Sequence, residues 1–120
     1  MASYLLETLS PVNSFSQLAS KHEYLARLQV AIQELHKCGA VWRETVPVHE
    51  VFREQTVWRG EVEMFDLIGH SKAKRCYAWS HREGPNDQGE RFVTVLELPP
   101  VDSPQSAVKA AIVDQTHRKQ

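Results

Sequence analysis

The sequence predicts an α+β fold in which a long N-terminal helix and a C-terminal helix pack on one face of an antiparallel sheet of three to four strands. Three runs in the middle of the chain alternate apolar and polar residues, whereas apolar residues at helical spacing appear only before and after them. The connections between these runs are short and rich in turn-forming residues, which favours antiparallel neighbours. Because 120 residues suffice to bury one core, we expect a single domain over residues 1–120.

The first helix is expected over residues 14–38. Ser14 and Gln17 form the S-x-x-Q pattern of a capping box, and Gly39 is the residue type at which helices commonly end. Apolar side chains recur between them at helical spacing: Leu18, Leu25, Leu28, Ile32 and Leu35. This spacing predicts an amphipathic helix that packs against the sheet.

The sheet is predicted from residues 40–56 and 57–98. The first range contains Pro47, which cannot donate a hydrogen bond to a central ladder, so this range forms either an edge strand or an extended connection. The second range contains the three alternating runs, joined by the segments GHSKA and EGPNDQGE. These connections favour a three-stranded β-meander.

The two ends of the chain differ in character. Residues 1–13 have mixed polarity and end in a turn with proline, so we expect an arm that packs against the rest of the domain. A second helix is expected over residues 103–117, because Ser103 is a good N-cap and Pro104 suits the first helical position.

Alternation along the predicted strands places apolar side chains on both faces of the sheet. Tyr77 and Trp79 share one face of their strand, and the run after them is apolar on both of its faces. Two helices on one face leave the other face to the N-terminal arm, a second subunit or a ligand. Large aromatic side chains dominate protein interfaces, which favours a homodimer, but the same residues would also fill a core.

The composition restricts the classes of function. Fourteen basic and fifteen acidic residues give a net charge of -1, which argues against nucleic-acid binding over the whole surface. No apolar run approaches the roughly 18 residues of a membrane span, and the N-terminus lacks the cationic start of a signal peptide, so we expect a cytoplasmic protein. In that compartment Cys38 and Cys76 are expected to be free thiols. Phosphate-binding glycine loops and dinucleotide fingerprints are absent from the sequence, so we expect no cofactor.

One local cluster offers nucleic-acid binding as an alternative. The turn at residues 72–75 is basic and leads into a strand with aromatic side chains, the arrangement that single-strand binders use. The residues of this candidate surface are Lys72, Lys74, Arg75, Tyr77, Trp79 and His81. Acidic residues on the neighbouring strand oppose this interpretation.

A second alternative is a small enzyme with an acid–base pocket. The side chains that could converge on such a cleft are His49, Glu50, Glu63 and His70. The competing interpretation is that His70 caps a turn and that Glu63 lies on a solvated strand face. We expect no metal site, because spacings such as H-x-x-x-H are missing and Cys76 and His81 face opposite sides of one strand. In the middle of a strand, Cys76 is expected in the core rather than as a nucleophile.

Two resemblances add to this reading of the residues. The order helix, three antiparallel strands, helix over residues 14–117 resembles the double-stranded-RNA-binding domain, in which lysines at the start of the second helix grip phosphates. Here that segment reads DSPQSAVKAA, with Asp102 first and Lys109 as its one cation, so the resemblance implies topology and not RNA binding. The segments VWRGEVEMFDLIGH, CYAWSH and RFVTVLELPPVDSPQSAVKAAI resemble a group of small bacterial proteins, some carried on mobile gene cassettes. That resemblance implies a compact bacterial domain and no particular activity.

Among these interpretations, the sequence favours a protein that binds rather than catalyses, as a homodimeric interaction or ligand-binding module in which the apolar sheet face or the first helix packs against a second copy. Nucleic-acid binding through the turn at residues 72–75, and an enzyme with a histidine and carboxylate pocket, stay as alternatives. A membrane partner is not expected.

Overall fold

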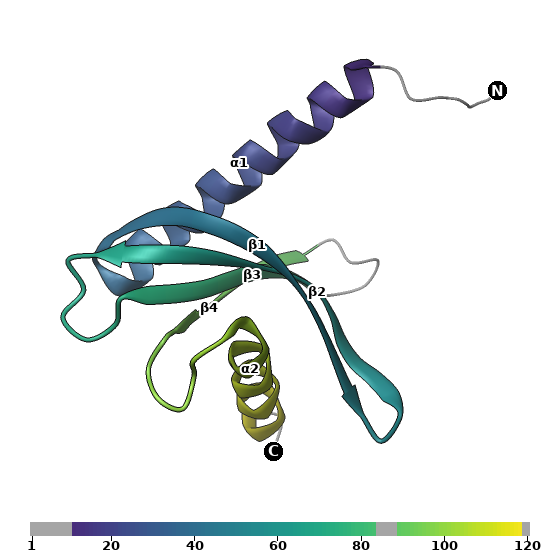
Figure 1. Ribbon diagram of the computed structural model, residues 1–120, viewed down its shortest axis with the longest axis vertical. Coiled ribbons are helices and arrows are strands. Elements are labelled where there is room, and N and C mark those ends of the chain that lie inside the picture. The colour runs from purple at the N-terminus through teal and green to yellow at the C-terminus, as the bar shows by residue number, and fades with distance from the viewer. Residues whose placement is uncertain (1–10, 84–88, 119–120) are drawn as a thin grey trace.

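Two helices and four strands follow one another in the computed structural model, which describes residues 11–83 and 89–118 (Figure 1). Side chains are described from residue 20 to 81 and from 90 to 114. The elements are α1 (Pro11–His36), β1 (Gly39–Phe52), β2 (Gln55–Ile68), β3 (Arg75–Glu83), β4 (Gly89–Leu96) and α2 (Pro104–Arg118). The strands form one antiparallel sheet in the order β1-β2-β3-β4. The predicted α+β class, with an antiparallel sheet and a helix at each end, is confirmed.

α2 begins where the sequence indicated, whereas α1 is shifted at both ends: Ser14 lies inside the helix rather than at its N-cap, and the helix ends at His36 rather than at residue 38. α1 begins at Pro11 rather than at Ser14, and most of the expected arm, residues 1–10, lies outside the described residues. At the C-terminal end of α1, Lys37 has a positive φ of 55° and donates its N–H to the carbonyl of Gln33 at 2.9 Å. The N-cap of α2 is Ser103, whose Oγ accepts the N–H of Ser106 at 3.1 Å.

The segment around Pro47 forms β1, an edge strand that pairs with β2 along its whole length. Its edge position explains why proline is tolerated there. β1 and β2 are joined by a two-residue turn, in which Arg53 and Glu54 both have positive φ, 52° and 64°. Positive φ at both central residues is typical of tight hairpin turns, because their twist matches that of the flanking strands.

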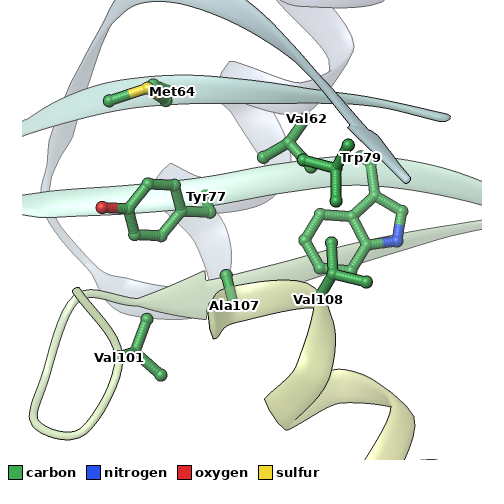
Figure 2. Close-up of a cluster of buried hydrophobic side chains, with 8 residues drawn as sticks. Val62, Met64, Tyr77, Trp79, Val101, Ala107 and Val108 are labelled. Atoms are coloured by element: carbon green, nitrogen blue, oxygen red, sulfur yellow. The ribbon is translucent and has the colours of Figure 1, made fainter. Parts of the chain in front are cut away.

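The two helices lie on opposite faces of the sheet, so the expectation that they share one face is wrong (Figure 1). On the α1 face the buried residues are Leu28, Ile32, Ala40, Phe65, Cys76 and Ala78. On the α2 face they are Val48, Val62, Met64, Tyr77, Trp79, Val101, Ala107 and Val108 (Figure 2). The physical reason is that alternation makes both faces of β2 and β3 apolar, and one helix can cover only one face. The aromatic face is therefore core.

The sheet is held together at its centre by a short seam between β2 and β3. These strands pair only from Glu63↔Ala78 to Asp66↔Arg75, whereas the β1–β2 and β3–β4 ladders continue well beyond the seam. The two hairpins diverge past this point, and the β1–β2 hairpin extends beside α2 (Figure 1). Next to the seam, the Tyr24 hydroxyl of α1 accepts the backbone N–H of Ser80 at 3.0 Å. This bond satisfies a donor of β3 that β2 no longer reaches.

Candidate functional site

The open edge of β4 directs backbone hydrogen-bonding groups away from the sheet. The N–H of Glu97 donates to the carbonyl of Arg75 at 2.9 Å, which makes this a hydrogen-bonded pair of the antiparallel ladder. Such pairs alternate along the ladder, so Val93 and Val95 also bond to β3. The N–H and C=O groups of Thr94, which lies between Val93 and Val95, and of Phe92, which precedes Val93, therefore point to the open edge.

The other edge of the sheet, β1, is built differently. β1 contains Pro47 and an unpaired residue, Arg43, at a register shift between Trp42 and Glu44, and its ladder with β2 has a second shift at which Val57 of β2 is unpaired. Proline and bulges are devices that prevent an edge strand from pairing with another chain. Over residues 92–96, β4 reads FVTVL, with no charge, no proline and no shift in its register with β3. Of the two edges, β4 is the one open to pairing.

Two hollows flank the β4 edge, and both include Phe92. The first has a volume of about 430 Å³ and lies between Leu35 at the end of α1, the strand, and Ala110 and Ala111 of α2. The second has a volume of about 350 Å³ and lies between α1 and Phe92. Apolar side chains at their rims are exposed, Val30 by 49% and Leu35 by 62%. The edge thus has a row of backbone donors and acceptors between two hollows, which are lined by apolar side chains and by charged ones, Arg91 and Asp114 in the first and Arg27 and Glu34 in the second.

The flank of α1 beside this edge follows β4 in the same direction. Near one end Arg27 contacts Glu90 at 2.5 Å, and near the other His36 Nε2 lies 2.9 Å from Thr94 Oγ1. The guanidinium of Arg27 also lies over the ring of Phe92, 5.7 Å from its centroid. The sequence reasoning missed this site. Its signal was the uncharged run FVTVL, but alternation alone does not tell an edge strand from a central one.

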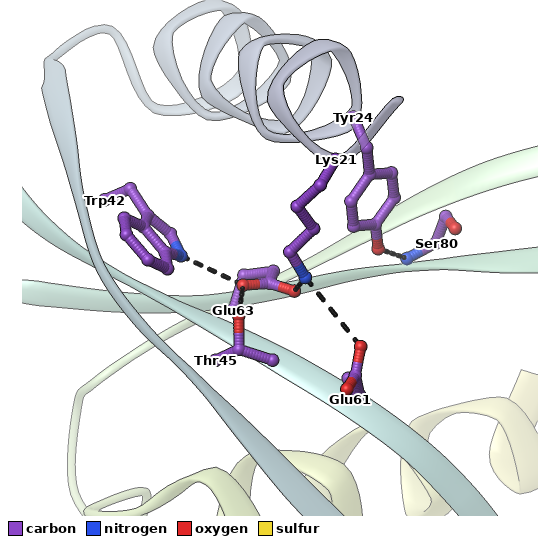
Figure 3. A network of polar contacts seen from close by, with 7 residues as sticks. All are labelled: Lys21, Tyr24, Trp42, Thr45, Glu61, Glu63 and Ser80. Atoms are coloured by element: carbon purple, nitrogen blue, oxygen red, sulfur yellow. Dashed lines mark hydrogen bonds and ion pairs between the residues drawn. The ribbon is translucent and has the colours of Figure 1, made fainter. Parts of the chain in front are cut away.

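Glu63, one of the residues of the predicted pocket, is fully buried under α1. Its Oε2 accepts from Lys21 Nζ at 2.6 Å, and its Oε1 accepts from Trp42 Nε1 at 2.9 Å and Thr45 Oγ1 at 2.6 Å (Figure 3). Three donors therefore satisfy one buried carboxylate, and they tie α1 and β1 to β2. Such a group braces the fold and is not accessible to a substrate.

The other three residues of the predicted pocket make separate contacts. His49 is exposed on β1, with its Nε2 2.6 Å from Thr56 Oγ1, and Glu50 faces Lys109 of α2 at 3.9 Å. His70 lies in the connection after β2, where its Nδ1 accepts the N–H groups of residues 72 and 73 at 3.0 and 2.9 Å. The structure therefore places these side chains at different points of the sheet rather than around one cleft.

The candidate nucleic-acid surface is also divided. Tyr77 and Trp79 are only 1% and 3% exposed, because α2 covers them. Burial, followed by the hydrogen bond to Glu97, raises the pKa of the Tyr77 hydroxyl. Of the remaining residues, Lys72, Lys74 and His81 are exposed, and Arg75 is half-buried with its Nε 3.5 Å from Asp66. The basic turn has no stacking partner in this buried aromatic pair.

Thiol and metal chemistry find little support in the described part of the chain. Cys76 is buried, and desolvation raises the pKa of its thiol to about 12, so the nucleophilic thiolate is scarce at neutral pH. Among the side chains described, no group of three histidine, cysteine or acidic residues is arranged to hold a metal ion.

Comparisons with known proteins give no indication of function, so we argue the proposed function from the geometry of the β4 edge. Neither α1 nor α2, within the residues described, combines the length and apolar character that a membrane crossing needs. The chain matches no protein-family model, no curated protein and no solved structure.

Proposed function

We propose that the protein is a homodimeric interaction module whose two copies join through their β4 edges. The observation that carries this proposal is the unprotected edge, with the backbone groups of Phe92 and Thr94 directed outward between two hollows. Antiparallel pairing of β4 with its own copy satisfies these groups and continues the sheet across a two-fold axis. Such strand addition is a common mode of protein recognition.

The exposed helix residues favour a second copy over an isolated peptide strand. A single added strand would lie in the plane of the sheet and leave Val30 and Leu35 of α1 in water. A second copy brings its own α1 and α2 to the same edge, so that these side chains are covered as well. Burial of apolar area adds about 25 cal/mol per Å² to the backbone hydrogen bonds.

The proposal is tested by placing proline at the edge. Thr94→Pro removes an outward N–H but no bond to β3, and edge strands tolerate proline at such positions. Thr94→Val is the matched control, because both variants lose the hydroxyl near His36 but valine keeps the N–H. We expect light scattering after size exclusion to show dimers for the wild type and Thr94→Val, and monomers for Thr94→Pro.

Circular dichroism must show that Thr94→Pro keeps the helix and strand content of the wild type. Amide hydrogen exchange adds a local measurement, because the N–H of Phe92 is protected only when a second strand covers the edge. A wild-type chain that stays monomeric at concentrations on the order of 100 µM would overturn the proposal, since that limits the association to very weak affinity.

A further inference from the structure

The exposed flank of α1 beside β4 carries opposite charges at its two ends. Arg27 and Glu34 line the hollow next to Phe92, with the small or apolar residues Ala26 and Val30 between and beside them. Arg27 and Glu34 are separated by two helical turns, about 10.5 Å along the axis. The Arg27 side chain remains 53% exposed despite its contact with Glu90, and Glu34 is exposed.

A two-fold axis exchanges the two ends of this flank. If the axis passes near Val30, Arg27 of each copy faces Glu34 of the other, and the apolar centre of the flank meets itself. The opposite charges are therefore self-complementary in an antiparallel helix pair. Small side chains at the centre let two helices approach to the usual 8–10 Å between axes.

The contacts between α1 and β4 locate the same axis on the strand. Arg27 contacts Glu90, and His36 contacts Thr94. The part of β4 beside the middle of this flank therefore lies between Glu90 and Thr94, at Phe92. Phe92 also lines the hollow that Val30 borders. An axis through Phe92 pairs outward-facing Glu90 with outward-facing Thr94, as a hydrogen-bonded β4–β4 ladder needs. Helix charges and strand register thus agree on one symmetric arrangement.

We propose that the two copies also associate through α1, which packs antiparallel to α1 of the other copy with Val30 near the two-fold axis. Arg27 then forms an ion pair with Glu34 of the partner subunit, twice in each dimer. This inference rests on the proposed β4 dimer and adds a second contact between the two copies. The strands supply the hydrogen bonds, and the helix flank sets the register in which the two β4 strands pair.

Disulfide cross-linking tests the position of the axis. In a Cys38→Ser background, which removes the half-exposed native thiol, Val30→Cys places two thiols near the axis, within the 4.4–6.8 Å between Cα atoms that a disulfide needs. Glu23→Cys is the control on the same helix face, because two copies of that residue lie about 22 Å apart in this arrangement. We expect mild oxidation to give covalent dimers for Val30→Cys and not for Glu23→Cys.

Charge reversal tests the ion pairs. Glu34→Arg places two pairs of arginines against each other, and we expect a dimer dissociation constant about tenfold higher. Salt screens such pairs, so the dissociation constant of the wild type should rise with salt while that of Glu34→Arg falls. A change in folding alone would not reverse this salt dependence.

The outcomes separate the two proposals. If Thr94→Pro dissociates the dimer but Val30→Cys cross-links no better than Glu23→Cys, and Glu34→Arg leaves the dissociation constant unchanged, the helix contact is wrong and the β4 dimer stands. If the wild type is monomeric, both proposals are overturned. Cross-linking of Val30→Cys together with reversed salt dependence of Glu34→Arg establishes the contact.

Discussion

The carboxylate of Glu63 joins one helix and two strands through one buried group, because its donors come from α1 and β1 while it belongs to β2. Replacement by glutamine keeps the shape but turns one acceptor oxygen into a donor that faces other donors. We expect Glu63→Gln to lower the free energy of unfolding by about 2–3 kcal/mol, as the loss of one partner from a buried ion pair is strongly destabilising. Urea denaturation followed by circular dichroism measures this loss.

Glu61 offers a control on the same strand. Its side chain is 66% exposed and its Oε1 lies 3.8 Å from the same Lys21 Nζ. Exposed ion pairs contribute little, so Glu61→Gln should change stability by less than about 0.5 kcal/mol. Equal effects of the two substitutions would contradict a special role of the buried carboxylate.

His36 is expected to make stability depend on pH. Burial, and then the charge of His70, lower the pKa of His36 below its ordinary value of 6.5. The folded protein therefore binds the proton less readily than the unfolded chain does. The contribution of neutral His36 is complete above about pH 6.5 and decreases as pH falls below that value.

His36→Gln should flatten this part of the profile. Urea midpoints measured from about pH 5 to about pH 7.5 would show a smaller slope for the variant than for the wild type, because the unfolded state no longer takes up this proton. An identical slope in both proteins would mean that His36 does not titrate differently on folding.

At the level of residues, local periodicity could not distinguish Glu63 from Glu61. The two residues are separated by one position in an alternating run, so the sequence assigns both to one strand face. They differ only in their position relative to the rest of the fold, since the seam with β3 begins at Glu63 and α1 covers that point. The donors Trp42 and Thr45 come from a strand with a bulge between them, which no alternation pattern predicts.

Within β2, Gly60 leaves room for the side chain of Trp58, which lies two residues before it on the same strand. The indole of Trp58 lies across Gly60, where a Cβ atom would be 2.9 Å from Trp58 Cη2. The same indole contacts Trp79 edge to face, with centroids 5.6 Å apart and planes at 67°. We expect Gly60→Ala to displace Trp58 from Trp79 and to lower the free energy of unfolding by about 1–2 kcal/mol, as overpacking does.

A double-mutant cycle isolates this contact. In a Trp58→Ala background the added methyl group meets no ring, so Gly60→Ala should be nearly neutral there or slightly stabilising, because alanine restricts the unfolded chain more than glycine. Denaturation midpoints for the four proteins provide the cycle. The same penalty in both backgrounds would show that backbone conformation, rather than the indole, requires glycine.

The elements themselves were more predictable than their arrangement. Alternation identified the middle strands, and Ser103 and Pro104 marked the start of α2 correctly. The placement of both helices on one face was wrong, because alternation says which side chains share a face but not which helix covers it. The short β2–β3 seam was also unpredictable, since it follows from how two twisted hairpins diverge.

For the whole molecule, a helix on each face covers the centre of the sheet, whereas its outer edges and the end of the β1–β2 hairpin, with Val51, Phe52 and Val57, stay exposed. β1 has Pro47 and a register shift at Arg43 along its edge, whereas β4 retains outward backbone groups beside a hollow. The aromatic face that the sequence offered for association is covered by α2. The proposed association uses the β4 edge, because main-chain pairing is possible there.

A dimer ties thermal stability to protein concentration. Two folded chains that unfold to separate monomers lose their association as they unfold, so the melting temperature rises with concentration by mass action. For two chains of this size, a tenfold increase in concentration should raise the melting temperature by about 3 °C, from the average unfolding entropy per residue. Calorimetry or circular dichroism over two decades of concentration should show this rise for the wild type and for Thr94→Val. Thr94→Pro should melt at one temperature throughout, and a rise of the same size in that variant would place the contact between copies away from β4.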